Sequence, residues 1–190
     1  VGLVNIIRNE NKETLQIPIQ PYPDVFNRLG LAGIIADNDA IIRSIQAYDH
    51  SEYDGNDYFN WTLEVTSLYL NDELIIITDT GNISIGDRVI PLQGNKMYLD
   101  FIGPPESFDY YPAFQVVLGD FPPETFRDKI VLIGATSITL QDLYPVPFSA
   151  KIRMPGVEIG ANAINTILTG KFHHVSPPIV NLIILITAAI

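Results

Sequence analysis

A continuous apolar run, KIVLIG at residues 129–134, is the sequence feature that most constrains the fold of this chain. It is rich in β-branched residues and ends at Gly134, which is typical of a strand buried on both faces of a sheet. Residues 154–172 then carry a helical pattern, with Pro155 at its start and Gly170 at its end. This order predicts an α/β fold: a mixed sheet with a buried central strand and flanking helices, plus a short β-hairpin region.

Two helices are expected to bury one apolar stripe each. Residues 58–70 place Trp61, Val65 and Leu68 at helical spacing. In the helix at residues 154–172 the apolar positions step by four, three and four residues. We expect that second stripe to pack on the sheet; its members are Val157, Ala161, Ile164 and Leu168.

The rest of the chain predicts short strands and turns. Residues 15–21 contain two prolines, which favours an edge strand or an extended linker, and residues 23–31 suit a short helix. Residues 31–48 have the pattern of a strand, a turn and a second strand, which predicts a hairpin. Residues 81–101 predict two or three strands, with a tight turn at Gly94 and Asn95.

Composition excludes several functional classes. The chain has 190 residues, 47% of them hydrophobic and 17% charged, which fits one globular domain and argues against disorder. With 11 basic and 22 acidic residues its net charge is -11, so nucleic acid is not an expected partner. The absence of cysteine excludes disulfides, a thiolate nucleophile and a zinc site of the cysteine type.

The acidic residues are concentrated in one region. Between Ser44 and Asp87 there are nine acidic residues and no Lys or Arg. A solvated face that favours solubility is the preferred interpretation. Calcium is the alternative, but the acidic residues do not follow the spacing of an EF-hand loop; they are Asp49, Glu52, Asp54 and Asp57.

The uncharged run at residues 179–190 is interpreted as the start of a transmembrane helix. At 1.5 Å per residue it covers about 18 Å of a hydrocarbon core of about 30 Å. The alternative, an amphipathic core helix, requires a polar face, which residues 182–186 lack. Because the chain begins with Val1, we expect a piece of a longer protein, with one domain at residues 1–176 and the membrane segment at 177–190.

A search for catalytic motifs leaves one candidate region. The chain has no G-x-S-x-G elbow, no Walker loop, no G-x-G-x-x-G fingerprint and no convincing set of metal ligands. We therefore expect no catalytic residue, no metal and no cofactor. Ligands of open α/β sheets bind beyond the carboxyl ends of strands, which favours the turn after the apolar run. The candidate ligand-binding residues are Gly134, Thr136, Ser137, Asp142, Glu158 and Asn162.

Each of these residues also has a structural interpretation. Gly134 would permit close packing, Asp142 would pin its loop, and Asn162 would bond to a neighbouring loop carbonyl. A further alternative is a membrane-tethered hydrolase that uses Asp142 and Glu158 as a carboxylate pair.

Residues 129–149 and the helix that follows resemble the C-terminal hallmark of the CHASE family of extracellular sensor domains, in its second variety. The matching elements include KIVLIGAT, Asp142, Pro147 and the start of the helix. A weaker match upstream is a turn similar to D-x-D-G-x-x-R, formed by Asp37, Asp39 and Arg43. The chain departs from the family pattern in three places, where Gly, Thr and His are usual: Ala40, Val146 and Gly160.

The resemblance implies a non-enzymatic sensor on the extracytoplasmic side of the cell membrane. Such domains are followed by membrane helices and a cytoplasmic adenylate or guanylate cyclase, diguanylate cyclase, histidine kinase or other protein kinase. The expected partners are a small-molecule or environmental stimulus, the membrane and a second copy in a homodimer. A structural or dimerisation module of a receptor is the alternative in this class.

Overall fold

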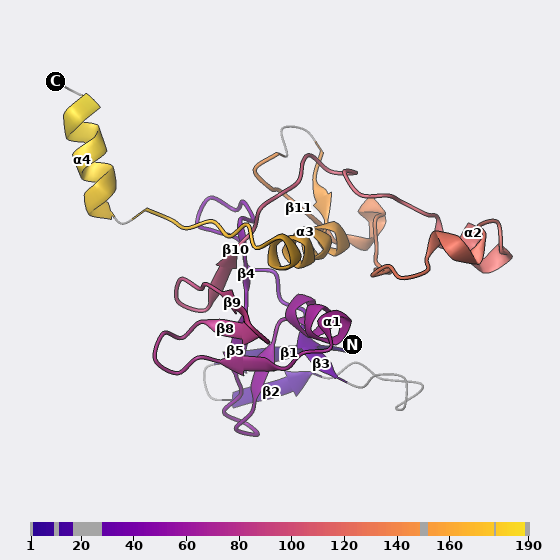
Figure 1. The fold of residues 1–190 in the computed structure, drawn as a ribbon, viewed down its shortest axis with the longest axis horizontal. Helices are drawn as coiled ribbons and strands as arrows, with labels where there is room; N and C mark the ends of the chain where they lie inside the picture. Colours follow the sequence, from indigo (N-terminus) through magenta and orange to yellow (C-terminus); the bar gives the residue numbers. More distant parts are fainter. Residues whose placement is uncertain (1, 10–11, 17–27, 149–151, 177, 189–190) are drawn as a thin grey trace.

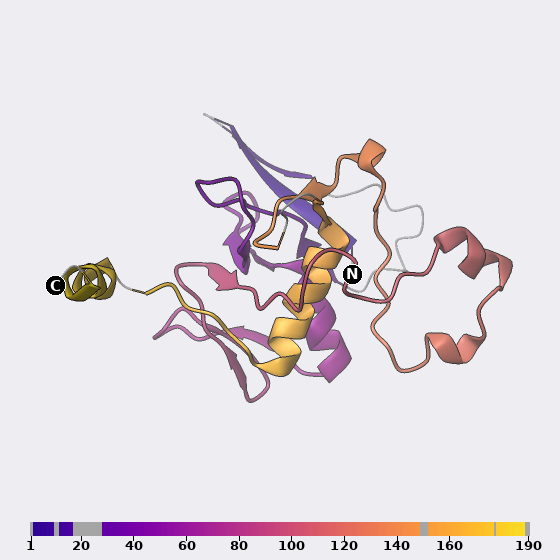
Figure 2. The ribbon, with the colours of Figure 1, turned by 90° about the horizontal axis from the view of Figure 1, so that it is seen from above.

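The computed structural model describes residues 2–9, 12–16, 28–148, 152–176 and 178–188. Its described part combines several small sheets with four α-helices, which confirms the expected mixed α/β class. Two helices lie side by side over the strands, while the C-terminal helix stands apart at the end of an extended segment (Figure 1). A long excursion of the chain, which contains α2 (Ala113–Leu118), projects from the side of the body opposite to the C-terminal helix (Figure 2).

The first strands form two small sheets. β1 (Gly2–Asn9) pairs with β2 (Lys12–Gln16) in antiparallel fashion and with β3 (Leu29–Leu31) in parallel fashion. β5 (Tyr48–His50) and β6 (Asp57–Phe59) form an antiparallel pair. The residues expected as an edge strand or linker at 15–21, and as a helix at 23–31, lie largely outside the described residues.

The central strands form two further antiparallel sheets. β4 (Ser44–Gln46) pairs with β10 (Lys96–Tyr98). β8 (Ile83–Ile85) lies between β7 (Leu74–Ile76) and β9 (Arg88–Ile90). The short strands expected between residues 81 and 101 are therefore confirmed.

The hairpin expected at residues 31–48 is not formed. β3 joins β1, and β4 joins β10, so the two predicted arms belong to different sheets. Of the first predicted arm only Leu31 lies in a strand, and local alternation does not specify which strand a partner comes from.

Helix α1 (Trp61–Leu70) ends where expected but begins three residues later than predicted, because Tyr58 and Phe59 belong to β6; it is capped at both ends. The Oδ1 atom of Asn60 accepts a hydrogen bond from the Thr62 N–H, and Asn71 ends the helix in the left-handed conformation. The predicted apolar stripe is wrong, because Leu68 is 44% exposed while Leu63 is fully buried. The buried face of α1 consists mainly of small and polar residues, which hydrophobic spacing does not detect.

Helix α3 (Gly156–Thr169) confirms the second predicted helix and its stop, since Gly170 has a φ of +70°. Its core-facing residues are Ile159, Ala163 and Ile167, all at 0% exposure. Of the predicted stripe only Ile164 is buried, so the contact face is rotated from the one expected. The rotation arises because α3 packs against α1 as well as the strands.

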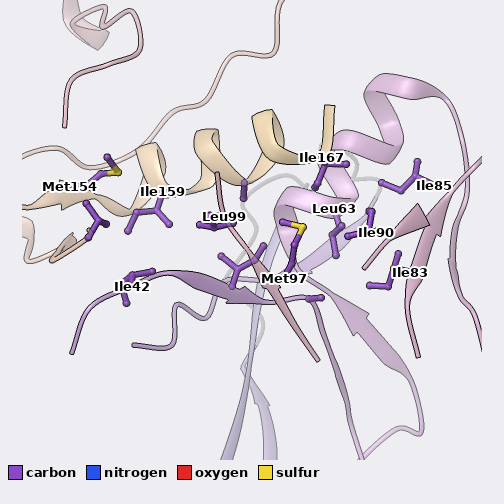
Figure 3. Packing of buried hydrophobic residues seen from close by; sticks show 14 residues of the cluster. Ile42, Leu63, Ile83, Ile85, Ile90, Met97, Leu99, Met154, Ile159 and Ile167 are labelled. Carbon is purple, nitrogen blue, oxygen red and sulfur yellow. The ribbon is translucent and has the colours of Figure 1, made fainter. Parts of the chain in front are cut away.

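The hydrophobic core lies between α3, α1 and the strands around β4, β8, β9 and β10 (Figure 3). Its largest fully buried apolar side chains are contributed by segments far apart in the sequence. They are Ile42, Leu63, Ile83, Ile85, Ile90, Met97, Met154, Ile159 and Ile167.

Trp61 of α1 packs between two glycines, Gly160 of α3 and Gly30 of β3. A Cβ atom at Gly160 would lie 2.1 Å from Cζ2 of Trp61, and one at Gly30 would lie 2.4 Å from the Cα of Trp61. Only residues without a side chain fit on either side of Trp61. The bulky indole thus occupies the space that a larger residue at position 160 would need.

The apolar run at residues 129–134 does not form the expected buried central strand. Val131 is 52% exposed and Ile133 is 90% exposed, and the segment belongs to none of the described strands. The run has strong strand propensity, but a strand is buried on both faces only when neighbouring strands pair with it. Within the described residues no strand is paired with this run.

The excursion around α2 contains a small aromatic cluster. α2 (Ala113–Leu118) and the 3₁₀ turn η2 (Pro123–Thr125) have no buried residues. Three rings nearby meet edge to face, with centroids 5.1 to 6.3 Å apart; they belong to Tyr111, Phe121 and Phe126. These contacts give the excursion a local core of its own.

Helix α4 (Pro178–Ala188) presents apolar side chains to solvent. Among the residues that the structure describes, no helix combines the length and apolar character needed to cross a membrane. The chain reaches α4 from Gly170 through the segment 171–176, which runs along the body before it departs (Figure 1).

The tight fit around Trp61 leads to a prediction about Gly160. We expect Gly160→Ala to lower the free energy of unfolding by about 1 to 3 kcal/mol, since the new methyl group overlaps the indole. The loss should be smaller when Trp61→Phe is also present, and chemical denaturation of the four proteins of the cycle measures this coupling. Gly33→Ala is the control, because a Cβ there meets no atom within 4 Å. Equal costs of Gly160→Ala in both backgrounds would contradict the proposed overlap.

Candidate functional site

The turn before β4 gathers four charged side chains. Arg43 bonds both carboxylate oxygens of Asp39 at 2.9 and 2.7 Å, and Asp37 at 3.2 Å. Lys96 reaches the same site from β10, with its Nζ 3.7 Å from Oδ1 of Asp37. The structure therefore brings together the three turn residues that the resemblance selected, and it adds Lys96, which was not predicted to lie there.

The ion pairs of this turn shift the pKa values of their partners. The hydrogen bond from Arg43, followed by one from the Ile41 N–H, lowers the pKa of Asp39 to about 2. The same bonds to Asp39 and then Asp37 raise the pKa of the Arg43 guanidinium. The ion pair of Asp39 with Arg43 therefore keeps both its charges at physiological pH.

A shallow hollow of about 430 Å³ lies beside this cluster. It is open to solvent and mostly polar. Its lining combines two cations and two carboxylates, so the formal charge of the charged groups around it sums to zero. The lining residues are Ala36, Asp37, Asn38, Asp39, Arg43 and Lys96.

One departure from the family pattern, alanine in place of glycine at position 40, lies where the backbone has an unusual conformation. Ala40 has a φ of +62°, in the left-handed region that favours glycine. Its N–H donates to the carbonyl of Asp37 at 2.8 Å, and the Asp37 N–H donates to the carbonyl of Ile41 at 3.1 Å, which close the turn. The turn thus adopts the conformation for which glycine is suited, with alanine in its place.

Two of the predicted ligand-binding residues, Gly134 and Asp142, pack against the start of α3. A Cβ atom at Gly134 would lie 2.5 Å from the Cβ of Val157, and one at Gly156 would lie 2.6 Å from Oδ1 of Asp142. The Asp142 carbonyl also accepts a hydrogen bond from the Gly156 N–H at 3.0 Å. Gly134 and Asp142 therefore both contact the first turn of α3, as close packing and loop pinning require.

Asp142 also affects a neighbouring tyrosine. Burial, and then the nearby Asp142 carboxylate, raise the pKa of Tyr144. Tyr144 belongs to β11 (Leu143–Tyr144), which pairs with β12 (Met154–Pro155) directly before α3.

Thr136 and Ser137 are exposed near this end of the helix. Ser137 caps the 3₁₀ turn η3 (Ile138–Leu140), since its hydroxyl accepts a hydrogen bond from the Thr139 N–H. The hydroxyl groups of Ser137 and Thr139 lie 2.8 Å apart. Of the candidate residues, Thr136 and Ser137 are the ones whose side chains face solvent together.

Glu158 and Asn162 belong to a buried polar row on α3 that also includes Thr166. Their spacing of four residues places all three on one face of the helix. Each accepts hydrogen bonds from backbone N–H groups of the segment 100–107. Asp100 N–H donates to Thr166 Oγ1 at 2.9 Å, and Ile102 N–H donates to Asn162 Oδ1 at 3.0 Å.

Glu158 completes the row with three hydrogen bonds. Its two carboxylate oxygens accept from the N–H groups of Glu106 and Ser107, each at 3.0 Å, and Oε2 also accepts from the Tyr110 hydroxyl at 2.9 Å. The side chain is only 2% exposed. Burial, followed by the hydrogen bond to Glu158, raises the pKa of Tyr110. The carboxylate thus holds a loop by charge-assisted hydrogen bonds.

Thr166 and the common role of the row were not predicted from the sequence. The signal was present in the spacing: polar residues at positions 158, 162 and 166 of a helix whose other faces are apolar. Asn162 was expected to bond to a loop carbonyl, whereas its Oδ1 accepts from a loop N–H and its amide group donates to the Glu158 carbonyl at 2.9 Å.

The acidic loop shows pairwise contacts. His50 Nδ1 lies 2.8 Å from Asp57 Oδ1, and the Tyr58 hydroxyl donates to Asp54 at 2.6 Å, which lowers the pKa of Asp54 to about 2. Within the described ranges, no three His, Cys, Asp or Glu residues are grouped so that they could hold a metal ion.

Comparison with known families agrees with this architecture. The model of the family described as CHASE2 domain matches residues 2–190, so the chain belongs to the CHASE2 domain family. CHASE2 domains are sensory, non-catalytic domains of signalling receptors, and this chain is accordingly a sensory domain rather than an enzyme. A search of curated proteins and a search of solved structures each found no match.

The left-handed conformation of Ala40 predicts that Ala40→Gly stabilises the domain. Glycine adopts this conformation without strain, and we expect the free energy of unfolding to rise by about 0.5 to 1 kcal/mol. Chemical denaturation measures the change. Ala36→Gly is the matched control in the same loop, where the added backbone freedom should be neutral or destabilising. A loss of stability in Ala40→Gly would show that the turn does not hold this conformation in solution.

The bonds of Glu158 predict the effect of an isosteric change. Glu158→Gln replaces one acceptor oxygen by an NH₂ group, which leaves a backbone N–H of the segment 106–107 without its acceptor. We expect a loss of about 1 to 3 kcal/mol in the free energy of unfolding. Glu124→Gln, at an exposed ion pair with Arg127, is the control and should change stability by less than about 0.5 kcal/mol. Similar effects of the two substitutions would contradict the role assigned to Glu158.

Proposed function

We propose that this chain is the extracytoplasmic sensory domain of a membrane-bound receptor, with α4 as the first part of a membrane segment. The observation that carries the proposal is the exposure of α4. Its apolar side chains face solvent without a polar face between them; they include Ile179, Ile183, Ile184, Leu185 and Ile186. Transfer of such a helix from water into an apolar phase lowers its free energy.

The length of α4 supports a membrane-embedded part of a longer span. Eleven residues extend about 16 Å at 1.5 Å per residue, roughly half of a hydrocarbon core. The Thr187 hydroxyl donates to the carbonyl of Ile183 at 3.0 Å, which satisfies that polar group inside the helix, as an apolar environment requires.

The stimulus is proposed to bind near the start of α3. Support comes from the exposed hydroxyl groups of Thr136 and Ser137 and from the contacts of Gly134 and Asp142 with the first turn of that helix. A ligand held there would act directly on the helix that leads to the membrane segment. It can shift signalling only if it binds two arrangements of that helix with different affinity. The effector is proposed to be a cytoplasmic nucleotide cyclase or protein kinase.

Homodimer formation is part of the same proposal. A dimerisation module of a receptor is still the alternative function for a domain of this family. The hydrolase hypothesis, in contrast, needs Asp142 and Glu158 as a carboxylate pair, and one of the two is not accessible. Glu158 is buried and engaged by three donors, so it is not available to exchange a proton with a substrate.

Association with lipid vesicles tests the membrane segment. We expect the full chain to sediment with phosphatidylcholine vesicles, and removal of residues 178–190 to abolish sedimentation while the thermal midpoint changes little. Ile183→Lys together with Leu185→Lys should weaken binding at least tenfold, because charged side chains are costly in hydrocarbon.

The control for these variants is Val117→Lys together with Ile133→Lys, which introduces the same two charges at positions outside α4 that are 86% and 90% exposed. It should leave vesicle binding unchanged. Equal binding by the full chain and by the chain without residues 178–190, or unfolding of the shortened chain, would refute the role proposed for α4.

A further inference from the structure

The segment that connects α3 to α4 is fastened to the body by a glutamine side chain. Gln93 Nε2 donates to the Val175 carbonyl at 3.1 Å, and Gln93 Oε1 accepts from the Val175 N–H at 3.1 Å. One planar amide group thus satisfies both backbone groups of a single residue, as a neighbouring β-strand would. Gln93 and Val175 are 82 residues apart in the sequence.

Two further contacts hold the same segment. His173 Nε2 lies 3.0 Å from Asp100 Oδ1, and the backbones of His173 and Tyr98 form a β-bridge. Upstream, Arg88 donates to the carbonyls of Ile167 and Leu168 at 2.9 and 3.0 Å, at the C-terminal end of α3. The chain is therefore held on both sides of Lys171.

The glutamine lies on a tight turn that also reaches the polar hollow. Gln93 and Lys96 exchange backbone hydrogen bonds at 3.0 and 3.3 Å, with Gly94 in the left-handed conformation between them. Lys96 lies at the hollow beside Asp37, while Gln93 lies at the exit segment. A single four-residue turn therefore contacts both the hollow and the chain that leaves the domain.

We propose that the Gln93–Lys96 turn is a latch that holds the exit segment 173–175 against the sheet, and that its opening is the movement which the domain passes to α4. The significance for signalling rests on the proposed function; the latch itself does not. The bonds that close it are suited to reversible opening. The bonds of Gln93 are between neutral groups at the surface, and such bonds contribute little net free energy because water replaces them.

Limited proteolysis of the full chain tests the latch. Lys171 is exposed and lies between the fastened positions, so trypsin cleaves after it when the segment detaches. We expect Gln93→Leu to accelerate this cleavage about tenfold, and Asp100→Ala to add to the effect, while the thermal midpoint stays nearly constant. Cleavage after Arg127, in the exposed excursion, is the internal reference and should not change. Hydrogen exchange at the Val175 amide should accelerate in parallel with cleavage at Lys171.

The matched control is Gln115→Leu, which makes the same chemical change on α2 and should leave cleavage at Lys171 unaffected. Two results would overturn the latch: an unchanged cleavage rate at Lys171 in Gln93→Leu, or an equal acceleration at Lys171 and Arg127, which indicates general loosening. The assay needs neither ligand nor membrane. A failure of vesicle binding would therefore refute the role of α4 and leave the latch standing, and the reverse also holds.

Discussion

The buried polar row on α3 is the constraint on which much of this structure depends. In the part of the chain that the structure describes, no strand pairs with the segment 100–107 to accept its N–H groups, and unpaired backbone groups are costly inside a protein. The oxygen atoms of Thr166, Asn162 and Glu158 accept four of these hydrogen bonds and so take the place of a neighbouring strand. A shift of α3 along its axis would break all of them together, so the helix and this segment move as one body.

In the proposed function the signal leaves the domain at the C-terminal end of α3, an end that several contacts hold. Its last turn is held by Arg88, and the following segment is held by Asp100 and Gln93. Asp100 also donates its own N–H to Thr166 of the polar row. The row, the end of the helix and the exit segment are therefore joined through shared contacts.

Two of the three departures from the family pattern have a visible local context. Gly160 stands where a larger residue is usual, and the indole of Trp61 occupies the space. Ala40 stands where glycine is usual and adopts the left-handed conformation nonetheless, within a turn whose ends are joined by the ion pairs of Arg43 with Asp37 and Asp39.

The sequence by itself determined the local elements: α1, α3 and its stop at Gly170, the strands near residues 81–101, and the family through the motifs around α3. These depend on propensity, capping and turn residues, which act between near neighbours. Tertiary structure alone decided that β4 pairs with β10, that the run at 129–134 stays exposed, and that Ile159 rather than Val157 faces the core. It also brought Lys96 to Asp37 and Gln93 to Val175. Those outcomes depend on which distant segments meet, and neither periodicity nor composition carries that information, because the same apolar run can be buried or exposed according to its neighbours.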